Sequence, residues 1–435
     1  MNRRNFIAHS SAALAAMMIP DAFAASPKKT RPVGANDRIN VALIGCRSMG
    51  WGNLVEFFNF PEANCMALCD VDQGVLRQRA SELEAHNHKR PLLYTDYRKL
   101  LENPDIDAVV IGTPDHWHCL MTVDACAAGK DVYVEKPLAN SIAECDAMVA
   151  ATRRYNRIVQ VGQQQRSGRM WHEMKRFIDT GALGKIASVN VWANFKYASI
   201  LQWSPDSNPP EGVDFDMWLG PAPLRSFNQH RFHGIWRMFW DYGGGLVTDW
   251  GVHLLDMALW GTGKDSLPNR VVAVGGNFAF PDNHAETFDT LSATWQYDDL
   301  LIQWNNVAAN ESGPYGKSYG IEFRGTNGSL VANRESWEVY PAGSPDKFSE
   351  QHLPDNLDRR NHVANFIACI KDHSLPLACP IENGALCAKF AHLANIAART
   401  RQSLSFNDAA HSFGLAEADA LVRPAYRAPW KFPEL

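Results

Sequence analysis

The sequence predicts an α/β protein of two domains, an N-terminal Rossmann domain with a doubly wound parallel sheet and a second α/β domain with a mainly antiparallel sheet. Over residues 38–163, short apolar runs alternate with segments of helical periodicity, which is typical of a parallel sheet covered by helices on both faces. Beyond residue 164 the strand-like runs follow one another without helices between them, which indicates antiparallel pairing. The chain has 435 residues, 46% of them hydrophobic, so each domain can bury a core.

The N-terminal segment has the features of an export signal. Arg3 and Arg4, a short apolar stretch and an Ala-Phe-Ala triplet predict a twin-arginine signal peptide over residues 1–24, and hence a periplasmic protein. The apolar stretch is too short to span a bilayer, and no later one reaches its length, so we expect no membrane span in the mature form. Residues 25–37 are polar and predict a linker. The alternative is a disordered N-terminus that carries two arginines by chance.

In the first domain, residues 38–163, strands and helices are expected in alternation. Each expected strand is a short apolar or β-branched run, and most end near Gly, Pro or Asp. The expected strands are 39–45, 65–72, 107–114, 132–137 and 157–163, and the expected helices lie within 49–60, 73–86, 118–129 and 140–155.

Residues 164–355 form the expected substrate and oligomerisation domain. A loop over 197–245 is rich in Trp, Pro, Gly and Arg, and loops of this length in compact domains are usually functional. The expected elements are a helix over 170–184 and strands over 187–196, 270–280, 290–297, 300–308 and 319–325. Residues 356–435 contain two further helical patterns, 359–373 and 382–401.

Charge and cysteine content exclude several classes of function. The formal net charge is −5 and no long basic run occurs, so we expect no nucleic-acid partner. The nine cysteines include no Cys-x-x-Cys pair. This favours buried free thiols over a disulfide framework or a zinc site, and no metal site is predicted.

A glycine-rich turn follows the first expected strand in the sequence GCRSMGWG. Gly45 and Gly50 fit the first and last positions of a dinucleotide fingerprint, but Arg47 replaces the middle glycine. Asp70 ends the second expected strand, where a carboxylate can bind a ribose diol, which favours NAD. Arg47 could instead hold a 2′-phosphate, so NADP stays open. An incidental glycine pair is the alternative interpretation.

The sequence GTPDHWH places further candidates at the same sheet edge. Thr113 and Pro114 close a strand at its carboxyl end, where ligands of doubly wound sheets lie. We expect His118 to start the following helix. His116 is expected to be exposed to solvent rather than to act as a ligand.

The sequence VEKP ends the next expected strand at that edge. Burying the charged amine of Lys136 costs free energy, which indicates a functional role for it. The proline after it favours extended backbone geometry, so the amine is expected to point into the cleft. The alternative is a surface salt bridge between Glu135 and Lys136.

Asp249 and His253 lie four residues apart in DYGGGLVTDWGVHLLDMALW, hence on one face of an expected helix. Oxidation of an alcohol needs a group that accepts the hydroxyl proton, and histidine suits this at neutral pH, with a carboxylate to orient it. Two alternatives stay open: a cation shared by the pair, or a helix-capping aspartate beside a buried histidine.

These motifs, in this order, resemble the glucose-fructose oxidoreductase, inositol dehydrogenase and rhizopine catabolism family (Gfo/Idh/MocA). The resemblance rests on AVVIGTPDHWHCLMTVDACAAGKDVYVEKPLA and the Asp249/His253 pair, covers about residues 38–400, and departs at Arg47. It implies a Rossmann domain, an α/β domain whose mainly antiparallel open sheet faces the cofactor, and C-terminal helices over 356–435 that pack back on the first domain. It also implies a homo-oligomer, a dimer or tetramer. DFDMWLGPAPLRSFNQHRFH and FWDYGGG are similar to the exported, sugar-acting branch.

The resemblance also implies roles for individual residues. Lys136 and His253 flank the reacting hydroxyl, with Asp249 beside them. Arg166, Arg237 and Tyr242 are candidates for substrate contacts. The residues expected to bind the cofactor are Gly45, Arg47, Met49, Gly50, Asp70, Thr113, Pro114, His118, Glu135, Lys136 and Gln164.

The predicted function is hydride transfer between a hydroxyl carbon of a sugar, glycoside or polyol and a nicotinamide cofactor. Export implies a tightly bound cofactor, because no pool of free NAD exists outside the cytoplasm. A glycoside hydrolase or lyase that works through a 3-keto intermediate is the first alternative. A non-catalytic sugar- or cofactor-binding module is the second.

Overall fold

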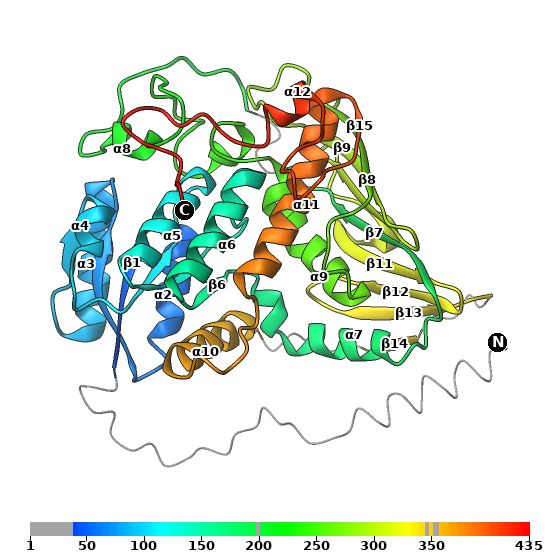
Figure 1. The fold of residues 1–435 in the computed structure, drawn as a ribbon, viewed down its shortest axis with the longest axis horizontal. Helices are drawn as coiled ribbons and strands as arrows, with labels where there is room; N and C mark the ends of the chain where they lie inside the picture. Colours follow the sequence, from blue (N-terminus) through cyan, green and yellow to red (C-terminus); the bar gives the residue numbers. More distant parts are fainter. Residues whose placement is uncertain (1–37, 197–200, 344–347, 351–355) are drawn as a thin grey trace, which may run out of the picture.

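The computed structural model describes residues 38–196, 201–343, 348–350 and 356–435. The signal peptide expected over residues 1–24 and the linker expected over 25–37 lie outside these residues. Within the described part of the chain, no helix has the length and apolar character needed to cross a membrane. Figure 1 shows the two domains side by side, the first on the left and the second on the right.

The first domain is a six-stranded parallel sheet in the order β3-β2-β1-β4-β5-β6, so the predicted doubly wound sheet is confirmed. Nearly all residues of the central strands are buried, which explains why those strands are continuous apolar runs. The strands are β1 Ile39–Ile44, β2 Ala63–Cys69, β3 Leu92–Tyr94, β4 Ala108–Ile111, β5 Asp131–Val134 and β6 Val159–Val161.

The helices of this domain cover both faces of the sheet. They are α2 Ser48–Phe57, α3 Gln73–Asn87, α4 Tyr97–Leu101, α5 Asp115–Ala127 and α6 Ile142–Tyr155. The short elements β3 and α4 were not predicted. The expectation that His118 starts a helix is wrong, because Pro114 occupies the N-cap position and α5 begins at Asp115.

The second domain contains a nine-stranded sheet in the order β14-β13-β12-β11-β7-β10-β9-β8-β15. Every pairing except β10 with β7 is antiparallel, which confirms the predicted sheet type. The last three strands before α10, and β15, were not predicted. The strands are β7 Ile186–Ala193, β8 Arg270–Gly276, β9 Thr290–Gln296, β10 Leu301–Val307, β11 Tyr319–Gly325, β12 Gly328–Ala332, β13 Trp337–Pro341, β14 Phe348–Glu350 and β15 Ser403–Leu404.

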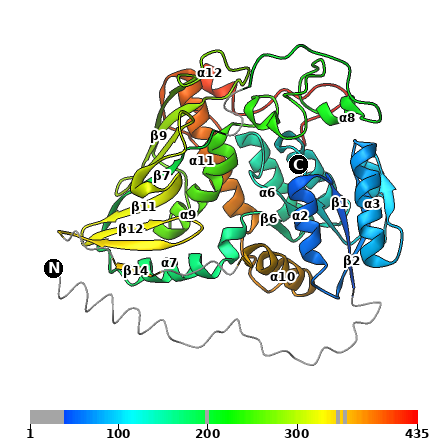
Figure 2. The ribbon, with the colours of Figure 1, turned by 180° about the vertical axis from the view of Figure 1, so that it is seen from behind.

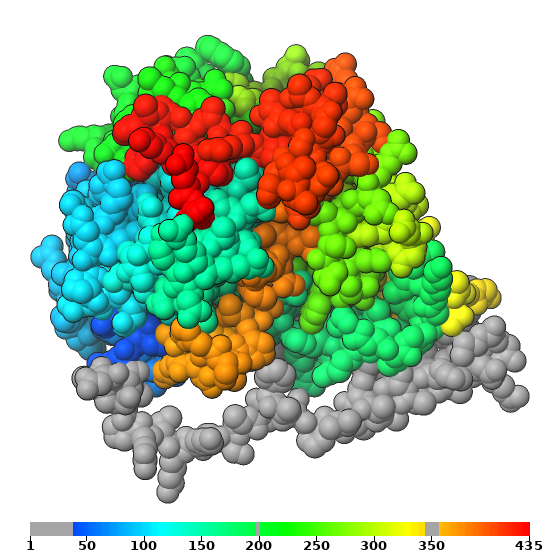
Figure 3. Space-filling view, viewed as in Figure 1, coloured from blue at the N-terminus to red at the C-terminus, as the bar shows by residue number. Residues whose placement is uncertain are grey.

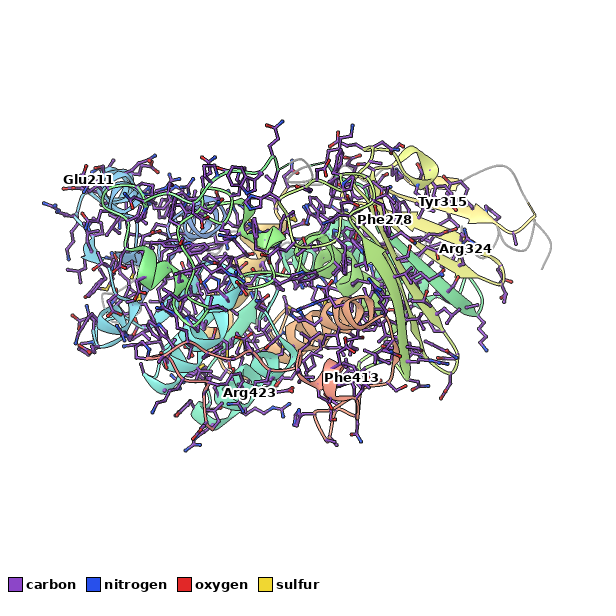
Figure 4. The ribbon with its side chains drawn as sticks, turned by 90° about the horizontal axis from the view of Figure 1, so that it is seen from above. Glu211, Phe278, Tyr315, Arg324, Phe413 and Arg423 are labelled. Carbon is purple, nitrogen blue, oxygen red and sulfur yellow. The ribbon has the colours of Figure 1, made fainter. Side chains whose placement is uncertain are left out.

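One face of this sheet packs against helices α7 Arg169–Asp179, α9 Val252–Thr262 and α11 Ile381–Thr400. Alternate side chains of the strands, among them Trp295 and Trp304, are fully buried there. The opposite face carries exposed side chains. Figure 4, seen from above, shows Tyr315 and Arg324 among the strands at one end of the molecule and Glu211 at the other end.

Two C-terminal helices connect the domains. Helix α10, Asp358–Lys371, packs against α2, and its Val363, Phe366 and Ile367 belong to the same buried cluster as β1 (Figure 2). Helix α11 runs between the domains and contacts α6 on one side and β8 on the other (Figure 1).

Residues 201–245, here called the bridging segment, cross from the second domain over the first. The segment contains α8 Phe215–Leu219 and the 3-10 turn Ile235–Met238, and its aromatic side chains form a buried cluster of their own. Its backbone pairs with the first domain, since Asp214 N donates to Val71 O at 3.0 Å. The expected long loop is therefore an ordered cover.

The C-terminal residues after β15, which include α12 Ala416–Asp419, form a strap that holds this cover in place. Arg427 donates to Asp216 Oδ1 at 2.7 Å and to Gly220 O at 3.1 Å, both in the bridging segment. Tyr426 donates to Glu144 Oε1 on α6 at 2.6 Å. Figure 3 shows the red C-terminal residues lying between the green segment and the cyan helices.

Glu144→Gln is expected to stabilise the protein at alkaline pH relative to the native chain. Burial raises the pKa of Glu144 from 4.5 to about 7. Because the pKa of Glu144 is higher in the folded state than in the unfolded state, the folded state favours the neutral acid. The free energy of unfolding therefore falls as the pH rises from 4.5 to about 7. The variant cannot ionise, so its advantage in free energy of unfolding should grow by about 3 kcal/mol between about pH 4 and about pH 8.5.

Urea denaturation at both pH values measures this difference. Glu211→Gln, at an exposed position of the bridging segment, is the control and should follow the native profile. Parallel profiles for Glu144→Gln and the native chain would contradict the prediction.

Candidate active site

A groove lies at the carboxyl edge of the parallel sheet, beneath the bridging segment. Its floor comes from the turns after β1, β2, β4 and β5, and its cover includes Met217, Trp218, His233, Trp236 and Arg237. Ligands of doubly wound sheets lie at this edge. The sheet therefore places the predicted site residues from four separate turns in one groove.

Three glycines shape the groove floor through backbone contacts that no side chain allows. Gly45 has φ +87°, and a Cβ on it would lie 2.8 Å from the carbonyl carbon of Gly112. A Cβ on Gly50 would lie 2.1 Å from Gly45 O, and one on Gly112 2.4 Å from the Cα of Gly50. The turn after β1, the start of α2 and the end of β4 thus meet directly and leave an open cradle. This fits a dinucleotide whose phosphates approach the backbone closely.

Asp70 is held beside this glycine turn. Its carboxylate accepts hydrogen bonds from Cys46 N at 2.7 Å and Asp72 N at 2.9 Å. Burial raises its pKa, although both hydrogen bonds oppose that shift. Arg47 and Met49 also line the groove, and Arg47 is exposed. The residues present therefore fit a cofactor with a ribose near Asp70.

The two histidines of GTPDHWH are both buried. His118 lies behind the groove, with Nδ1 2.8 Å from Pro137 O and Nε2 3.0 Å from Thr113 O, so it ties the turn after β4 to the turn after β5. The expectation that His116 is exposed is wrong. Its Nε2 lies 3.0 Å from Trp218 O in the bridging segment, and burial lowers its pKa to about 4.

Lys136 connects the two domains inside the groove. Its Nζ donates to Asp249 Oδ1 at 2.6 Å and to Asp249 O at 3.1 Å, and only 7% of its side chain is exposed. The alternative of a surface salt bridge with Glu135 is wrong. The Glu135 carboxylate is buried and accepts from Asn53 Nδ2 at 2.7 Å.

Asp249 and His253 lie on neighbouring turns at the start of α9. The chain makes one π-helical turn, Val247–Gly251, before α9 begins. Arg237 Nε also donates to Asp249 Oδ1, at 3.2 Å, so two cations share this carboxylate. Among the described residues, His253 Nδ1 is buried without a hydrogen-bond partner. Burial and the charges of Lys136 and Arg334 hold the pKa of His253 well below 6.5, opposed by Asp249.

Gln164, Arg166 and Tyr242 do not line the groove, and neither do Gly50, His118, Asp249 and His253. Gln164 is buried in the 3-10 turn Gln164–Ser167. Arg166 forms a buried ion pair with Asp256, with nitrogen–oxygen distances of 2.8 Å. Tyr242 is fully buried and packs edge-on against Trp218. Their proposed roles stay predictions, and the structure gives Arg166 a partner within the protein.

Sequence reasoning missed Asp115, which lines the groove directly after the Thr-Pro turn. Its carboxyl is buried, and burial raises its pKa well above the ordinary value, opposed by the charges of Arg237 and Lys136. The acidic residue of the sequence GTPD, directly after the end of a strand, could have indicated Asp115 as a groove residue. Among the described residues, no group of His, Cys, Asp and Glu has the arrangement of a metal site, and all nine cysteines are free and buried.

Comparison with known proteins decides the family. Residues 39–163 match the family described as "Oxidoreductase family, NAD-binding Rossmann fold", and residues 168–432 match "Oxidoreductase family, C-terminal alpha/beta domain". The chain belongs to the Gfo/Idh/MocA oxidoreductase family. Its first domain therefore belongs to the NAD-binding Rossmann domains of this oxidoreductase family.

Curated relatives carry two kinds of name. A glycosyl hydrolase family 109 protein of Shewanella baltica is 27% identical over 203 residues, which cover 43% of this chain and 44% of that protein. The match thus spans less than half the length of that relative. A levoglucosan dehydrogenase of Pseudarthrobacter phenanthrenivorans is 26% identical over 343 residues, which cover 74% of this chain and 78% of that protein.

Solved structures share the two-domain fold. The WlbA dehydrogenase of Bordetella pertussis, in complex with NADH and UDP-GlcNAcA, has a TM-score of 0.64 at 18% identity over 85% of this chain and 99% of that one. An aldose-aldose oxidoreductase of Caulobacter crescentus, complexed with glycerol, has a TM-score of 0.63 at 20% identity over 85% of this chain and 100% of that one. At these identities the likeness concerns the fold alone.

His253 is expected to stay neutral at pH values where an ordinary histidine is already protonated. The lowered pKa means that protonation costs more in the folded protein, so the transition lies at lower pH than in a model peptide. Nitrogen-15 NMR of the histidine rings, with His253→Gln for assignment, measures the transition. In Asp249→Asn it should move lower still, because the charge that raises the pKa is gone. A midpoint at or above that of the peptide would contradict the prediction.

Proposed function

We propose that this protein transfers hydride between a hydroxyl-bearing carbon of a sugar, glycoside or polyol and a tightly held nicotinamide dinucleotide. The observation that carries the proposal is the contact between the domains, in which Lys136 Nζ reaches Asp249 Oδ1 at 2.6 Å next to His253. The contact joins Lys136, which lines the groove, to Asp249 of the second domain, four residues before His253. This supports Lys136 as the hydrogen-bond donor and His253 as the proton acceptor. The similarity to a levoglucosan dehydrogenase supports a carbohydrate substrate.

His253, Lys136 and Asp249 have separate roles in the proposed transfer of the hydroxyl proton. A bound nicotinamide supplies the hydride acceptor. His253, held neutral by its buried surroundings, accepts the proton of the reacting hydroxyl. Lys136 donates a hydrogen bond to the same oxygen and stabilises its developing negative charge. Asp249 orients Lys136 and Arg237, which both donate to its Oδ1 atom.

The bridging segment supports tight retention of the cofactor. His233 Nε2 lies 3.1 Å from Asp72 Oδ2, and Gln73 N donates to Gly212 O at 3.0 Å, both beside the ribose end of the groove. A bound dinucleotide would therefore leave only if the segment detached from the first domain. Asp70 supports NAD as the cofactor, and the exposed Arg47 leaves NADP as the alternative.

We also propose export to the periplasm by the twin-arginine route. This route carries folded proteins, so the chain can bind its cofactor before export. The support is the Arg3-Arg4 pair and the apolar stretch of residues 1–24. A cofactor that does not exchange must be regenerated in place, by a second substrate or by return of the hydride to the first.

A homo-oligomer that assembles through the outer face of the nine-stranded sheet is a further part of the proposal. Three apolar side chains of β8 and β10 point outward there: Val272, Val274 and Leu301, with 45%, 69% and 40% of their surfaces exposed. An exposed apolar sheet face is typical of an interface. No nucleic-acid partner is proposed.

Lys136→Met is expected to lower turnover by about 100-fold or more while the cofactor stays bound. A side chain that takes part in proton transfer typically contributes a rate factor of at least this size. Hydride transfer is followed by absorbance at 340 nm, and mass spectrometry of the denatured protein reports the bound dinucleotide. Lys130→Met is a matched control. Lys130 is similarly buried, with 6% of its surface exposed, but lies at the opposite end of β5 and donates to Asn103 O. Near-native turnover in Lys136→Met would refute the assignment.

A redox-neutral glycoside hydrolase or lyase is the second candidate. The similarity to glycosyl hydrolase family 109 proteins favours it. In that cycle the sugar is oxidised to a 3-keto glycoside, the aglycone is eliminated, water adds and the same hydride returns to the ketone. The buried Asp115 carboxyl in the groove could protonate the departing aglycone oxygen.

A chromogenic glycoside separates the two candidates. The oxidoreductase is expected to change the 340 nm absorbance of its bound cofactor on addition of sugar and to release no aglycone. Steady aglycone release without net formation of reduced cofactor would instead establish the hydrolase or lyase. Asp115→Asn should slow aglycone release in that case, and it serves as the internal check.

A further inference from the structure

In the part of the chain that the structure describes, two arginines near the groove lack the carboxylate partners that buried guanidinium groups usually have. Arg334 follows β12 in the second domain, and Arg359 lies in the first turn of α10. Among the described residues, Arg334 Nε donates to Gln165 Oε1 at 3.1 Å and Arg359 Nη2 to Met49 Sδ at 3.5 Å, and neither forms an ion pair. Arg359 Nε is buried without a hydrogen-bond partner.

Arg334 lies beside Trp250, directly before α9, and Arg359 lies beside the start of α2. Arg334 lies over the ring of Trp250, with 4.6 Å from Cζ to the ring centroid, and Trp250 packs edge-on against His253 at 6.2 Å. Arg359 contacts Met49, which lines the groove. Arg334 is thus connected to His253 through Trp250, and Arg359 to the start of α2 through Met49.

The charges of the two arginines act on each other. Burial lowers the pKa of Arg334, and the charge of Arg359 adds a smaller effect in the same direction, while Tyr319, Asp358 and Asp249 oppose it. Like charges in a partly buried place are costly unless an anion compensates them. Guanidinium groups bind planar carboxylates with two hydrogen bonds each, which fits this requirement.

We propose that Arg334 and Arg359 bind the carboxylate of an acidic sugar, so that the substrate class is a uronate or a glycoside of one. This rests on the proposed function, because it assigns the substrate of the same groove. The arginines act in binding and orientation, and the chemistry stays with Lys136 and His253. Phosphate of the dinucleotide is the other anion that could reach Arg359, but Arg334 lies on the second domain beside His253.

The test measures binding of sugars to the protein as purified with its cofactor, by tryptophan fluorescence and calorimetry. D-Glucuronate and D-galacturonate are compared with D-glucose and D-galactose. At least one uronate is expected to bind about 10-fold more tightly than its neutral counterpart, the factor typical of a charge-assisted hydrogen bond. Arg334→Met and Arg359→Met should each remove this preference and leave neutral sugars unchanged.

Arg360→Met is the control, because Arg360 is adjacent on α10, exposed, and paired with Glu56 at 3.3 Å. It should keep the preference. Equal binding of uronates and neutral sugars by the native protein, or an unchanged preference in Arg334→Met, would overturn the proposal. Loss of the dinucleotide from Arg334→Met, seen by mass spectrometry, would also overturn it by assigning the arginine to cofactor phosphate.

These readouts do not depend on hydride transfer. Lys136→Met is expected to keep the uronate preference even though it loses turnover. An inactive hydride-transfer assay combined with intact uronate selectivity would count against the proposed function and in favour of the acidic-sugar site. Normal turnover of neutral sugars without uronate selectivity would count against the acidic-sugar site and in favour of the proposed function.

Discussion

The buried ion pair between Lys136 and Asp249 is the interaction on which the site depends. It joins a turn of the first domain to α9 of the second at 2.6 Å, and both side chains are almost entirely buried. Removing water from two charges costs several kcal/mol per ion, and only a close, well-bonded pair recovers this. Loss of Asp249 would take the carboxylate partner from the buried Lys136, whereas loss of Lys136 would leave Asp249 paired with Arg237. The groove therefore has its functional shape only when both domains are docked, and α10 and α11 fix that docking.

The cover over the groove follows from contacts that are distant in sequence. The bridging segment has its own aromatic cluster, is paired with the first domain near Val71, and is held from above by Arg427. Gly220 shows how close the fit is, because a Cβ there would lie 2.1 Å from the ring of Trp117. A cover with a buried cluster of its own opens less readily than an exposed surface loop. This supports a cofactor that stays bound through many turnovers.

The sequence predicted the long buried strands and the positions of the motifs, because continuous apolar runs and glycine or proline stops are local signals. It did not predict β3, an edge strand of three residues with little burial, or β12, β13 and β14, which mix polar with apolar side chains. His116 was expected to be exposed because its partner, the carbonyl of Trp218, lies 102 residues further along the chain. The partner of Lys136 is 113 residues away and could be inferred only from the family resemblance. Arg334 and Arg359 belong to no local motif, so only the folded chain brings them near the groove.

The electrostatics of the site connect the base to the substrate. In the protein alone, the charges of Lys136 and Arg334 disfavour protonation of His253. A neutral imidazole with so low a pKa is a weak base for a hydroxyl proton. An anionic substrate group bound to Arg334 would neutralise one of those charges and raise the pKa of His253. The base would then gain strength only when the substrate is in place, and the same guanidinium would govern both selectivity and reactivity. A neutral sugar could occupy the groove but would not change the base in this way.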